Sequence, residues 1–138
     1  MHPRNKSTLE RGVSLVEVMI VVVILGVIAA FVIPSFQESS ARGKRSEGQT
    51  ALVKASQRMK TFYTENNTFT TTLANAAINA TTPQGFYILA IAAPTVACPI
   101  ASCFLLQATP QGTHAGDRCG VLTYSSTGTS GAATSGCW

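Results

Sequence analysis

The sequence predicts an α+β fold in which one long N-terminal helix, hydrophobic in its first half, packs on a small antiparallel β-sheet. Three observations indicate this class. The chain of 138 residues carries an apolar run near its start, and helical periodicity follows that run as far as residue 65. Beyond residue 85, short β-rich runs are separated by Pro and Gly, and four cysteines lie among them. Such a small sheet is stable when a helix covers one of its faces.

The composition argues against disorder and against catalysis. Hydrophobic residues make up 46% of the chain and charged residues 12%, which is about half the usual charged fraction, whereas disorder needs the opposite balance. Lys and Arg number 10 against 6 Asp and Glu, an excess too small and scattered to indicate a nucleic-acid binder. Two His, one Asp and five Glu offer few catalytic groups. We therefore expect a protein that is not an enzyme and that needs no metal or cofactor.

The apolar run is long enough to cross a membrane. Residues 18–33 are sixteen consecutive residues without a polar side chain, and extending the run back to Val13 adds only Ser14 and Glu17 as polar residues. As a helix, residues 13–33 span roughly 31 Å at ~1.5 Å per residue, close to the ~30 Å hydrocarbon core of a bilayer. The sequence thus predicts a single membrane-anchoring helix followed by a water-soluble domain.

A short positive segment precedes this run. Residues 1–12 carry three basic side chains and one Glu, and such a segment stays on the cytoplasmic side while the following chain crosses the membrane. An ordinary secretory signal peptide is the alternative, with cleavage at small residues such as Ala29 and Ala30. Bulky Phe31 and Val32 follow that point immediately, which argues against such a cleavage.

The junction between the two segments is more specific. Gly12 stands directly before the apolar run, and Glu17 is a lone carboxylate five residues beyond it. This arrangement, from Arg11 onward, resembles the class III signal of type IV prepilins. The resemblance implies that a prepilin peptidase cuts between Gly12 and Val13 and methylates the new N-terminus at Val13, where the family most often has Phe.

The resemblance extends to about Phe69 and implies roles in filament assembly for Glu17 and Pro34. A charged group inside a bilayer is costly, and an unpaired carboxylate in a bundle of apolar helices would cost several kcal/mol. The family relationship implies that Glu17 accepts the Val13 amine of a neighbouring subunit and so sets the axial register. The alternative is that Glu17 only extends towards the lipid headgroups near the helix end.

Helical periodicity resumes after Pro34, which interrupts the backbone hydrogen bonds where the apolar run ends. The apolar side chains of the second half recur at the spacing of one helix face. They are Leu52, Ala55, Met59, Phe62 and Tyr63. We expect one helix over residues 15–65, kinked near Pro34. Its first half suits a membrane or a filament core, and its second half needs a sheet to cover its apolar stripe.

Basic residues gather on the second half of this helix and raise the question of DNA binding, since phosphate contacts need only a positive surface. The set consists of Arg42, Lys44, Arg45, Lys54, Arg58 and Lys60. Some minor pilins of the resembled family capture DNA. We favour a solvated helix face instead, because Glu38 and Glu47 are interleaved with these residues and no aromatic platform lies between the charges.

A polar connection rich in Asn, Thr and Ala covers about residues 66–85 and is expected to lie on the surface. Three β-rich runs follow, at residues 86–91, 103–109 and 120–125, with Pro, Gly and Ser around them. A tail rich in Gly and Ser comes last. The sequence therefore predicts three short antiparallel strands packed on the amphipathic half of the helix.

Four cysteines permit three disulfide pairings. The domain follows a membrane anchor and is expected to face an oxidising compartment, whereas zinc is disfavoured because the sequence has no Cys-x-x-Cys pair and no His cluster. We choose Cys98–Cys103 and Cys119–Cys137, since the first pair brackets a turn containing Pro99 and the second ties the tail to the third strand. His114 lies close to Cys119 in sequence, but a thiol held in a disulfide is not a nucleophile.

The C-terminal half adds to the resemblance. Residues 117–122 and the final Cys137 and Trp138 look like the corresponding parts of minor pilins of the PilE type. In that family the last two cysteines bracket an end loop that is exposed to neighbours or solvent. The Thr- and Ala-rich connection and the extra pair Cys98 and Cys103 depart from that pattern.

The resemblance implies three segments. Residues 1–12 are a leader that is removed, and residues 13–40 are the hydrophobic half of the helix, which serves as transmembrane and assembly segment. Residues 41–138 are a soluble domain with a disulfide loop at 119–137. We expect a structural minor pilin, made in the inner membrane with its domain in the periplasm and then assembled into an extracellular pilus for motility or adhesion. Expected partners are other pilin subunits, prepilin peptidase, the inner-membrane assembly machinery and, before assembly, membrane lipid. The alternatives are a pseudopilin of a type II secretion system and a pilus-associated DNA-uptake or adhesin module.

Overall fold

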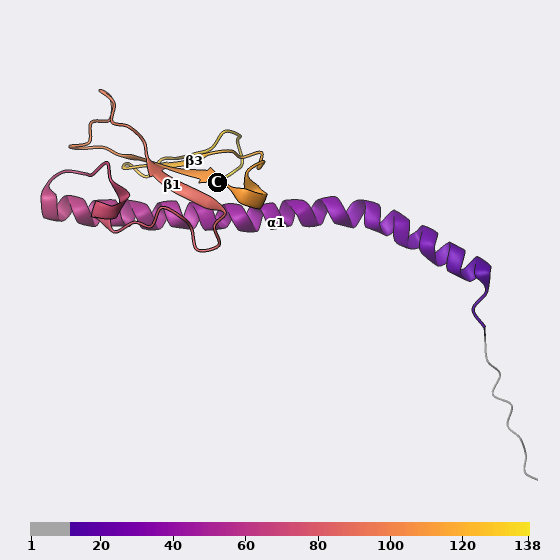
Figure 1. The fold of residues 1–138 in the computed structure, drawn as a ribbon. Coiled ribbons are helices and arrows are strands. Elements are labelled where there is room, and N and C mark those ends of the chain that lie inside the picture. The colour runs from indigo at the N-terminus through magenta and orange to yellow at the C-terminus, as the bar shows by residue number, and fades with distance from the viewer. Residues whose placement is uncertain (1–11) are drawn as a thin grey trace, which may run out of the picture. The chain divides into compact units, whose positions relative to one another are not determined.

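The structure, a computed structural model, describes residues 12–138 of the chain (Figure 1). The chain divides into two compact units, Met1–Glu38 and Ser39–Trp138. One α-helix, α1 (Leu15–Asn66), begins in the first unit and ends in the second. The basic leader residues expected before the membrane anchor lie outside the described residues.

In the first unit, the described residues are almost wholly the apolar part of α1. This part is long and apolar enough to cross a membrane, and none of its most apolar stretch is buried within the protein. Large apolar side chains from Val13 to Phe36 are exposed, and Glu17, in the first turn, is the one charged residue of this apolar part. Pro34 is itself a helical residue of α1. The first unit thus presents an apolar surface that nothing among the described residues covers.

The second unit contains a four-stranded sheet beside the second half of α1 (Figure 1). Its strands are β1 (Tyr87–Ile91), β2 (Leu105–Pro110), β3 (Leu122–Ser125) and β4 (Ser130–Gly131), which neighbour one another in sequence order. Each pairing is antiparallel. The predicted α+β class is confirmed, and the three predicted strands are present with ends that differ by one or two residues.

Strand β4 was not predicted. Its two residues lie in the Gly- and Ser-rich tail, and neither residue type favours a strand. The strand forms because it continues a hairpin from β3, where it pairs with Thr123 and Tyr124. The backbone N–H of Ser125 donates to the carbonyl oxygen of Thr129 at 2.9 Å and closes the turn. Hairpin geometry, rather than residue type, creates this edge strand.

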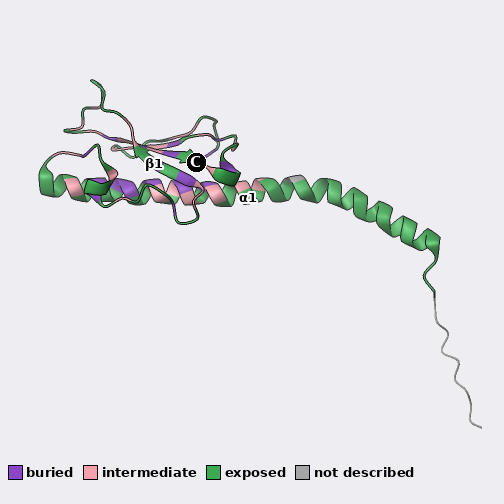
Figure 2. Ribbon diagram, viewed as in Figure 1, coloured by how far each residue is buried: buried purple, intermediate pink, exposed green. Residues whose placement is uncertain are grey.

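The core lies between α1 and one face of the sheet (Figure 2). Helix residues at the spacing of one face are buried, and alternate residues of β1 and β2 meet them. The largest fully buried side chains are Tyr87, Phe104, Leu52, Met59, Leu106, Leu122 and Cys119. Gly48 permits a close approach of helix and sheet, because a Cβ there would lie 2.9 Å from the Tyr87 ring. The sheet therefore covers the apolar stripe of the second half of α1.

Aromatic contacts hold the connection between α1 and β1 to the core. The ring of Phe69 lies 4.6 Å from that of Tyr63 and 4.8 Å from that of Phe104, measured between centroids. A short 3-10 helix, η1 (Leu73–Ala76), follows. The connection is thus a surface segment with an apolar anchor rather than a free tether.

Two disulfides fix the loops around the sheet. Cys98–Cys103 closes the loop between β1 and β2, with Cα atoms 5.0 Å apart, and Cys119–Cys137 closes a loop that contains β3 and β4, with Cα atoms 5.7 Å apart. These are the two pairs chosen from the sequence. The second bridge fastens the tail of the chain beside the segment that leads into β3.

Candidate functional site

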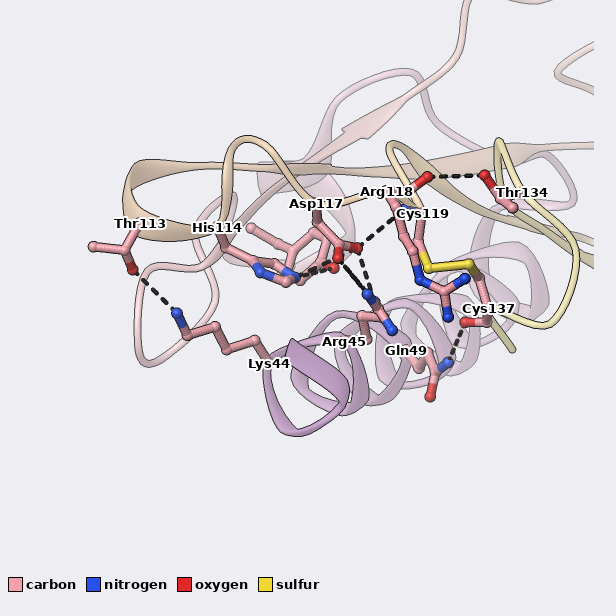
Figure 3. Close-up of polar contacts among 11 residues, drawn as sticks. Lys44, Arg45, Gln49, Thr113, His114, Asp117, Arg118, Cys119, Thr134 and Cys137 are labelled. Atoms are coloured by element: carbon pink, nitrogen blue, oxygen red, sulfur yellow. Dashed lines mark hydrogen bonds and ion pairs between the residues drawn. A yellow bond between two sulfur atoms is a disulfide. The ribbon is translucent and has the colours of Figure 1, made fainter. Parts of the chain in front are cut away.

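A buried ion pair joins α1 to the loop before β3 (Figure 3). Arg45, on α1, donates from Nε to both carboxylate oxygens of Asp117, at 3.0 Å to Oδ1 and 2.9 Å to Oδ2, and from Nη2 to Oδ1 as well. Only 5% of the Arg45 side chain and 3% of the Asp117 side chain are exposed. A charge-assisted pair of this geometry is strong, and loss of either partner would leave a buried charge alone.

His114 and Tyr87 extend the ion pair into what we call the buried polar cluster, which consists of Arg45, Tyr87, His114 and Asp117. The Tyr87 hydroxyl oxygen and His114 Nε2 lie 3.0 Å apart, and His114 Nε2 lies 3.7 Å from Asp117 Oδ2. Asp117 also accepts a hydrogen bond from the backbone N–H of Cys119 at 3.3 Å. The carboxylate therefore sits at the centre of the cluster.

Burial and the ion pair determine the protonation states in this cluster. Burial lowers the pKa of His114 below its ordinary value of 6.5, against the opposing effect of the Asp117 carboxylate. The hydrogen bond from Arg45 lowers the pKa of Asp117, and burial raises the pKa of Tyr87 to about 12. At neutral pH the cluster thus holds one guanidinium, one carboxylate, a neutral imidazole and a neutral phenol.

The cluster fastens the disulfide loop of residues 119–137 to α1. Asp117 stands two residues before Cys119, and on the other side of the bridge Gln49 Nε2 donates to the backbone oxygen of Cys137 at 2.8 Å (Figure 3). These contacts position the loop, and the Cys119 sulfur is not a nucleophile because it is held in a disulfide. Among residues 12–138, no group of three or more His, Cys, Asp or Glu side chains is placed to hold a metal ion.

The six basic residues proposed from sequence as DNA contacts lie in different environments. Arg45 is buried in the ion pair and is not a surface cation, contrary to its place in that set. Lys44 is half-buried, since its Nζ donates to Thr113 Oγ1 at 3.3 Å and lies 4.9 Å from the centroid of the Phe86 ring. The other four are exposed, namely Arg42, Lys54, Arg58 and Lys60. Of the six cations, one is therefore buried in an ion pair, one is half-buried against Thr113 and Phe86, and four are exposed.

Sequence reasoning missed the Arg45–Asp117 pair, although one signal for it exists. Arg45 precedes Leu52 by seven residues, which is the spacing of the apolar stripe, so the periodicity placed a charge on the buried face. Asp117 carried no comparable signal. It lies in a loop 72 residues further along the chain, and no local pattern indicates where that loop folds back.

Lys54 and Arg58 line a cavity of about 370 Å³ between α1 and residues 77–83, which we call the helix–loop cavity. Its lining includes the buried apolar residues Ala55 and Leu89. Asn79, from the connection after α1, also lines it. The spacing of Lys54 and Arg58, four residues apart, puts both cations on one side of the helix.

A second cavity, of about 500 Å³, lies where α1 meets the end of the described chain, and we call it the Trp138 cavity. Its lining consists of Gln49, Thr50, Val53, Lys54, Gln57 and Trp138. The Trp138 Nε1 donates to the carbonyl oxygen of Gly131 at 2.7 Å, and its ring lies 5.7 Å from that of Tyr124. The ring is therefore held in place while 41% of the residue remains exposed.

The residues expected to act in processing and assembly all lie in the first unit. Gly12 and Val13 precede α1 and are exposed, and Glu17 is an exposed residue of its first turn. Pro34 lies further along the same helix. The buried polar cluster, in contrast, belongs entirely to the second unit, so the structure separates two groups of candidate residues.

Solved proteins with the same architecture are type IV pilins. A type IV pilin from Shewanella oneidensis aligns with 71% of this chain and 97% of its own, at 24% sequence identity and a TM-score of 0.53. The non-core minor pilin PilV of Neisseria meningitidis aligns with 71% of this chain and 91% of its own, at 25% identity and a TM-score of 0.56. The long helix, the antiparallel sheet and the C-terminal disulfide therefore make up a type IV pilin fold.

The sequence matches define the family within this class. Residues 34–123 match the family described as type IV minor pilin ComP, DNA uptake sequence receptor, and residues 8–33 match the prokaryotic N-terminal methylation motif. The chain belongs to this family of type IV minor pilins. The resemblance to type IV pilins that the sequence analysis stated is thereby confirmed.

Curated relatives resemble parts of the chain. The type IV major pilin protein PilA of Myxococcus xanthus is 41% identical over 68 residues, which are 49% of this chain and 29% of PilA. A type IV major fimbrial protein FimA of Dichelobacter nodosus is 46% identical over 41 residues, which are 30% of this chain and 26% of FimA. The match thus spans less than a third of either relative.

Proposed function

We propose that this chain is a structural minor pilin, made as a membrane-anchored precursor and assembled into a bacterial type IV pilus after cleavage at Gly12. The observation that carries this proposal is the first unit itself. Its helix exposes apolar side chains, and Glu17 is the one charge of its apolar part. Such a surface needs lipid or other apolar helices around it, because exposing it to water costs about 25 cal/mol for each Å².

The precursor spans the inner membrane once, with its second unit in the periplasm. The positive leader, residues 1–12, supports this orientation, because basic segments stay on the cytoplasmic side. The two disulfides of the second unit agree with an oxidising compartment. Assembly then replaces lipid around the apolar helix by the helices of other subunits, and the inner-membrane machinery supplies the energy.

Prepilin peptidase cuts between Gly12 and Val13 and methylates the Val13 amine. Both residues are exposed and precede the first helical residue, so the bond lies outside the helix, where a peptidase can reach it. The match of residues 8–33 to the N-terminal methylation motif supports this step. Cleavage removes the basic leader and creates an α-amino cation at the start of the apolar helix.

Glu17 receives that cation from a neighbouring subunit. The carboxylate lies one helical turn beyond Val13, and in a dry helical bundle it needs a partner of opposite charge. The Val13 amine of the next subunit is such a partner. Their pairing sets the axial register of the new subunit. Pro34 lies where the apolar stretch that enters the filament core ends.

Mass spectrometry of sheared surface filaments tests the proposal in one measurement. We expect a subunit that begins with N-methylated Val13. A filament subunit that retains residues 1–12 would contradict the processing step, and absence of the subunit from filaments would contradict the structural role. We further expect the variant Glu17→Leu to be processed but largely excluded from filaments, whereas Ile20→Leu, one turn away, enters them normally.

A second function, capture of DNA, is supported by the family match. The matched family is described as a DNA uptake sequence receptor, and Lys54 and Arg58 are exposed on one side of α1. Binding of the full chain, in a nonionic detergent, to duplex DNA at rising salt concentration tests it. We expect affinity to fall steeply with salt, because phosphate contacts release counterions. No binding at low salt would refute DNA capture and leave the structural role intact.

A further inference from the structure

The helix–loop cavity and the Trp138 cavity adjoin, because Lys54 lines both of them. One ligand can therefore lie across α1, with one part in each cavity. Arg58 extends the positive lining into the helix–loop cavity. The linings of the two cavities thus place Trp138, Lys54 and Arg58 in that order along a path across α1.

The two cations on this path have no carboxylate partner within the part of the chain that the structure describes. No ion pair of Lys54 or Arg58 occurs among residues 12–138. The nearest carboxylates along α1 are seven residues away from either cation, at Glu47 and Glu65, and Glu47 Oε1 accepts the backbone N–H of Gln84. Like charges four residues apart destabilise a helix, so an external anion is the partner that this arrangement suits.

The rest of the second unit contributes almost no competing charge. Residues 66–116 and 119–138 contain no Asp, Glu, Lys or Arg. Asp117 is engaged by Arg45 inside the buried polar cluster. Arg118, in the loop before β3, is the one other cation of residues 66–138. The exposed cations of α1 therefore supply most of the positive charge of this unit, and a polyanion is attracted mainly to the helix.

Trp138 adds a platform for stacking beside these cations. Its ring is positioned by the hydrogen bond to Gly131 and by the Tyr124 ring, so little side-chain freedom remains to be lost on binding. Bases of single-stranded nucleic acid stack on such rings, whereas a duplex hides its base faces in its own stack. An aromatic ring that shares a cavity with one cation, Lys54, and is followed by a second, Arg58, suits a single strand, which presents both base faces and phosphates.

We propose that Lys54, Arg58 and Trp138 form a site for single-stranded DNA, with a base stacked on Trp138 and backbone phosphates on the two cations. The proposal rests on the DNA-capture function above and narrows it to a strand form. Gln57 lines the same cavity as Trp138 and supplies an amide for the base edge. The site reads an unpaired segment of DNA rather than the grooves of a duplex.

The test uses the full chain in a nonionic detergent and a mixed-sequence oligonucleotide of about 20 nucleotides, which exceeds the site size of similar surfaces. Fluorescence anisotropy compares the single strand with the same sequence as a duplex. Trp138 is the one tryptophan of the chain, so its emission reports stacking directly. We expect the single strand to bind about five-fold or more tightly than the duplex and to quench this emission.

Variants separate stacking from charge. Trp138→Ala is expected to weaken single-strand binding by about five-fold or more while leaving duplex binding unchanged, and Trp138→Phe keeps most of the preference. Lys54→Gln and Arg58→Gln weaken both strand forms and reduce the salt dependence. Lys60→Gln is the matched control, since Lys60 is an exposed cation of α1 that lines neither cavity.

The binding results distinguish failure of the single-strand proposal from failure of DNA capture. Equal or tighter binding of the duplex, or unquenched Trp138 emission with the single strand bound, overturns this proposal and leaves DNA capture standing. Failure of both strand forms to bind at low salt overturns DNA capture and this proposal together. Should Trp138→Ala misfold, the unaltered chain still tests stacking through its own emission, and Trp138→Phe tests the strand preference.

Discussion

The two halves of α1 differ in what covers them. In the first half, apolar side chains are exposed, and Glu17 is the one charge among them. In the second half, the apolar stripe is covered by the sheet, and a charged residue, Arg45, is buried with its partner Asp117. One helix thus carries an apolar surface that no described residue covers and an apolar stripe that the sheet covers.

This difference predicts which half of α1 affects the stability of the folded domain and which half affects assembly. Substitutions in the second half change the free energy of unfolding of the second unit, because its contacts are internal. Substitutions in the first half leave that free energy unchanged and act on insertion and filament packing. Urea unfolding of the full chain in a nonionic detergent measures this division, and the fluorescence of its one tryptophan, Trp138, follows the transition.

The largest change in the free energy of unfolding is expected from Asp117→Ala. This variant leaves the Arg45 guanidinium buried without its carboxylate, so the free energy of unfolding should fall by about 3–5 kcal/mol. The double variant Arg45→Met with Asp117→Leu removes both charges and should recover most of the loss. Equal losses in the single and double variants would show that packing, and not the unpaired charge, dominates at this site.

A matched pair of apolar truncations in α1 tests the comparison directly. Leu52→Ala removes a fully buried side chain and should lower the free energy of unfolding by about 2–5 kcal/mol. Val22→Ala removes an exposed side chain of the first half and should change it by no more than about 0.5 kcal/mol. A comparable loss from Val22→Ala would mean that the first half also stabilises the folded domain.

Glycine substitutions sharpen the comparison inside the second unit. Gly48→Ala puts a Cβ 2.9 Å from the Tyr87 ring and should cost about 1–3 kcal/mol of unfolding free energy through overpacking. At Gly43 a Cβ meets nothing within 4 Å, so Gly43→Ala should stabilise by up to about 1 kcal/mol through helix propensity. Stabilisation by both variants would contradict the close approach of α1 and β1.

The smallest effect is a loss of stability in mild acid. The pKa of His114 is lowered by burial in the folded protein, so below its ordinary 6.5 the unfolded chain takes up a proton first and stability falls as pH falls. Asp117 adds to this only below its ordinary 3.8, because its folded pKa is lowered too. Urea titrations at several pH values should show the first loss begin near pH 6.5, and His114→Gln should abolish it.

The sequence predicted the elements whose signals are local. The sixteen apolar residues, the helical stripe around Leu52 and the three β-rich runs each carry their own periodicity, and all of them appear in the structure. The edge strand β4 was missed because it depends on pairing with β3 and not on its own Ser and Gly residues. Contacts set by the path of a loop are invisible to periodicity.

The candidate sites show the same limit. The junction at Gly12 and Glu17 is a contiguous motif and could be recognised from the sequence. The path of Trp138, Lys54 and Arg58 could not, because the tryptophan is 84 residues from Lys54 in sequence and reaches α1 only through the folding of its loop. From the sequence, DNA binding was disfavoured because Glu38 and Glu47 are interleaved with the cations and no aromatic group lies between them. In the structure, Trp138 lines the same cavity as Lys54.

The Arg45–Asp117 contact has a consequence for how such pilins diversify. The disulfide alone does not make this loop free to change its residues, because the segment that enters it carries the counter-ion of a helix residue. Exchange of that segment between relatives is tolerated only when the helix position changes with it. Covariation of positions 45 and 117 should therefore mark which natural loops can be transplanted onto which helices.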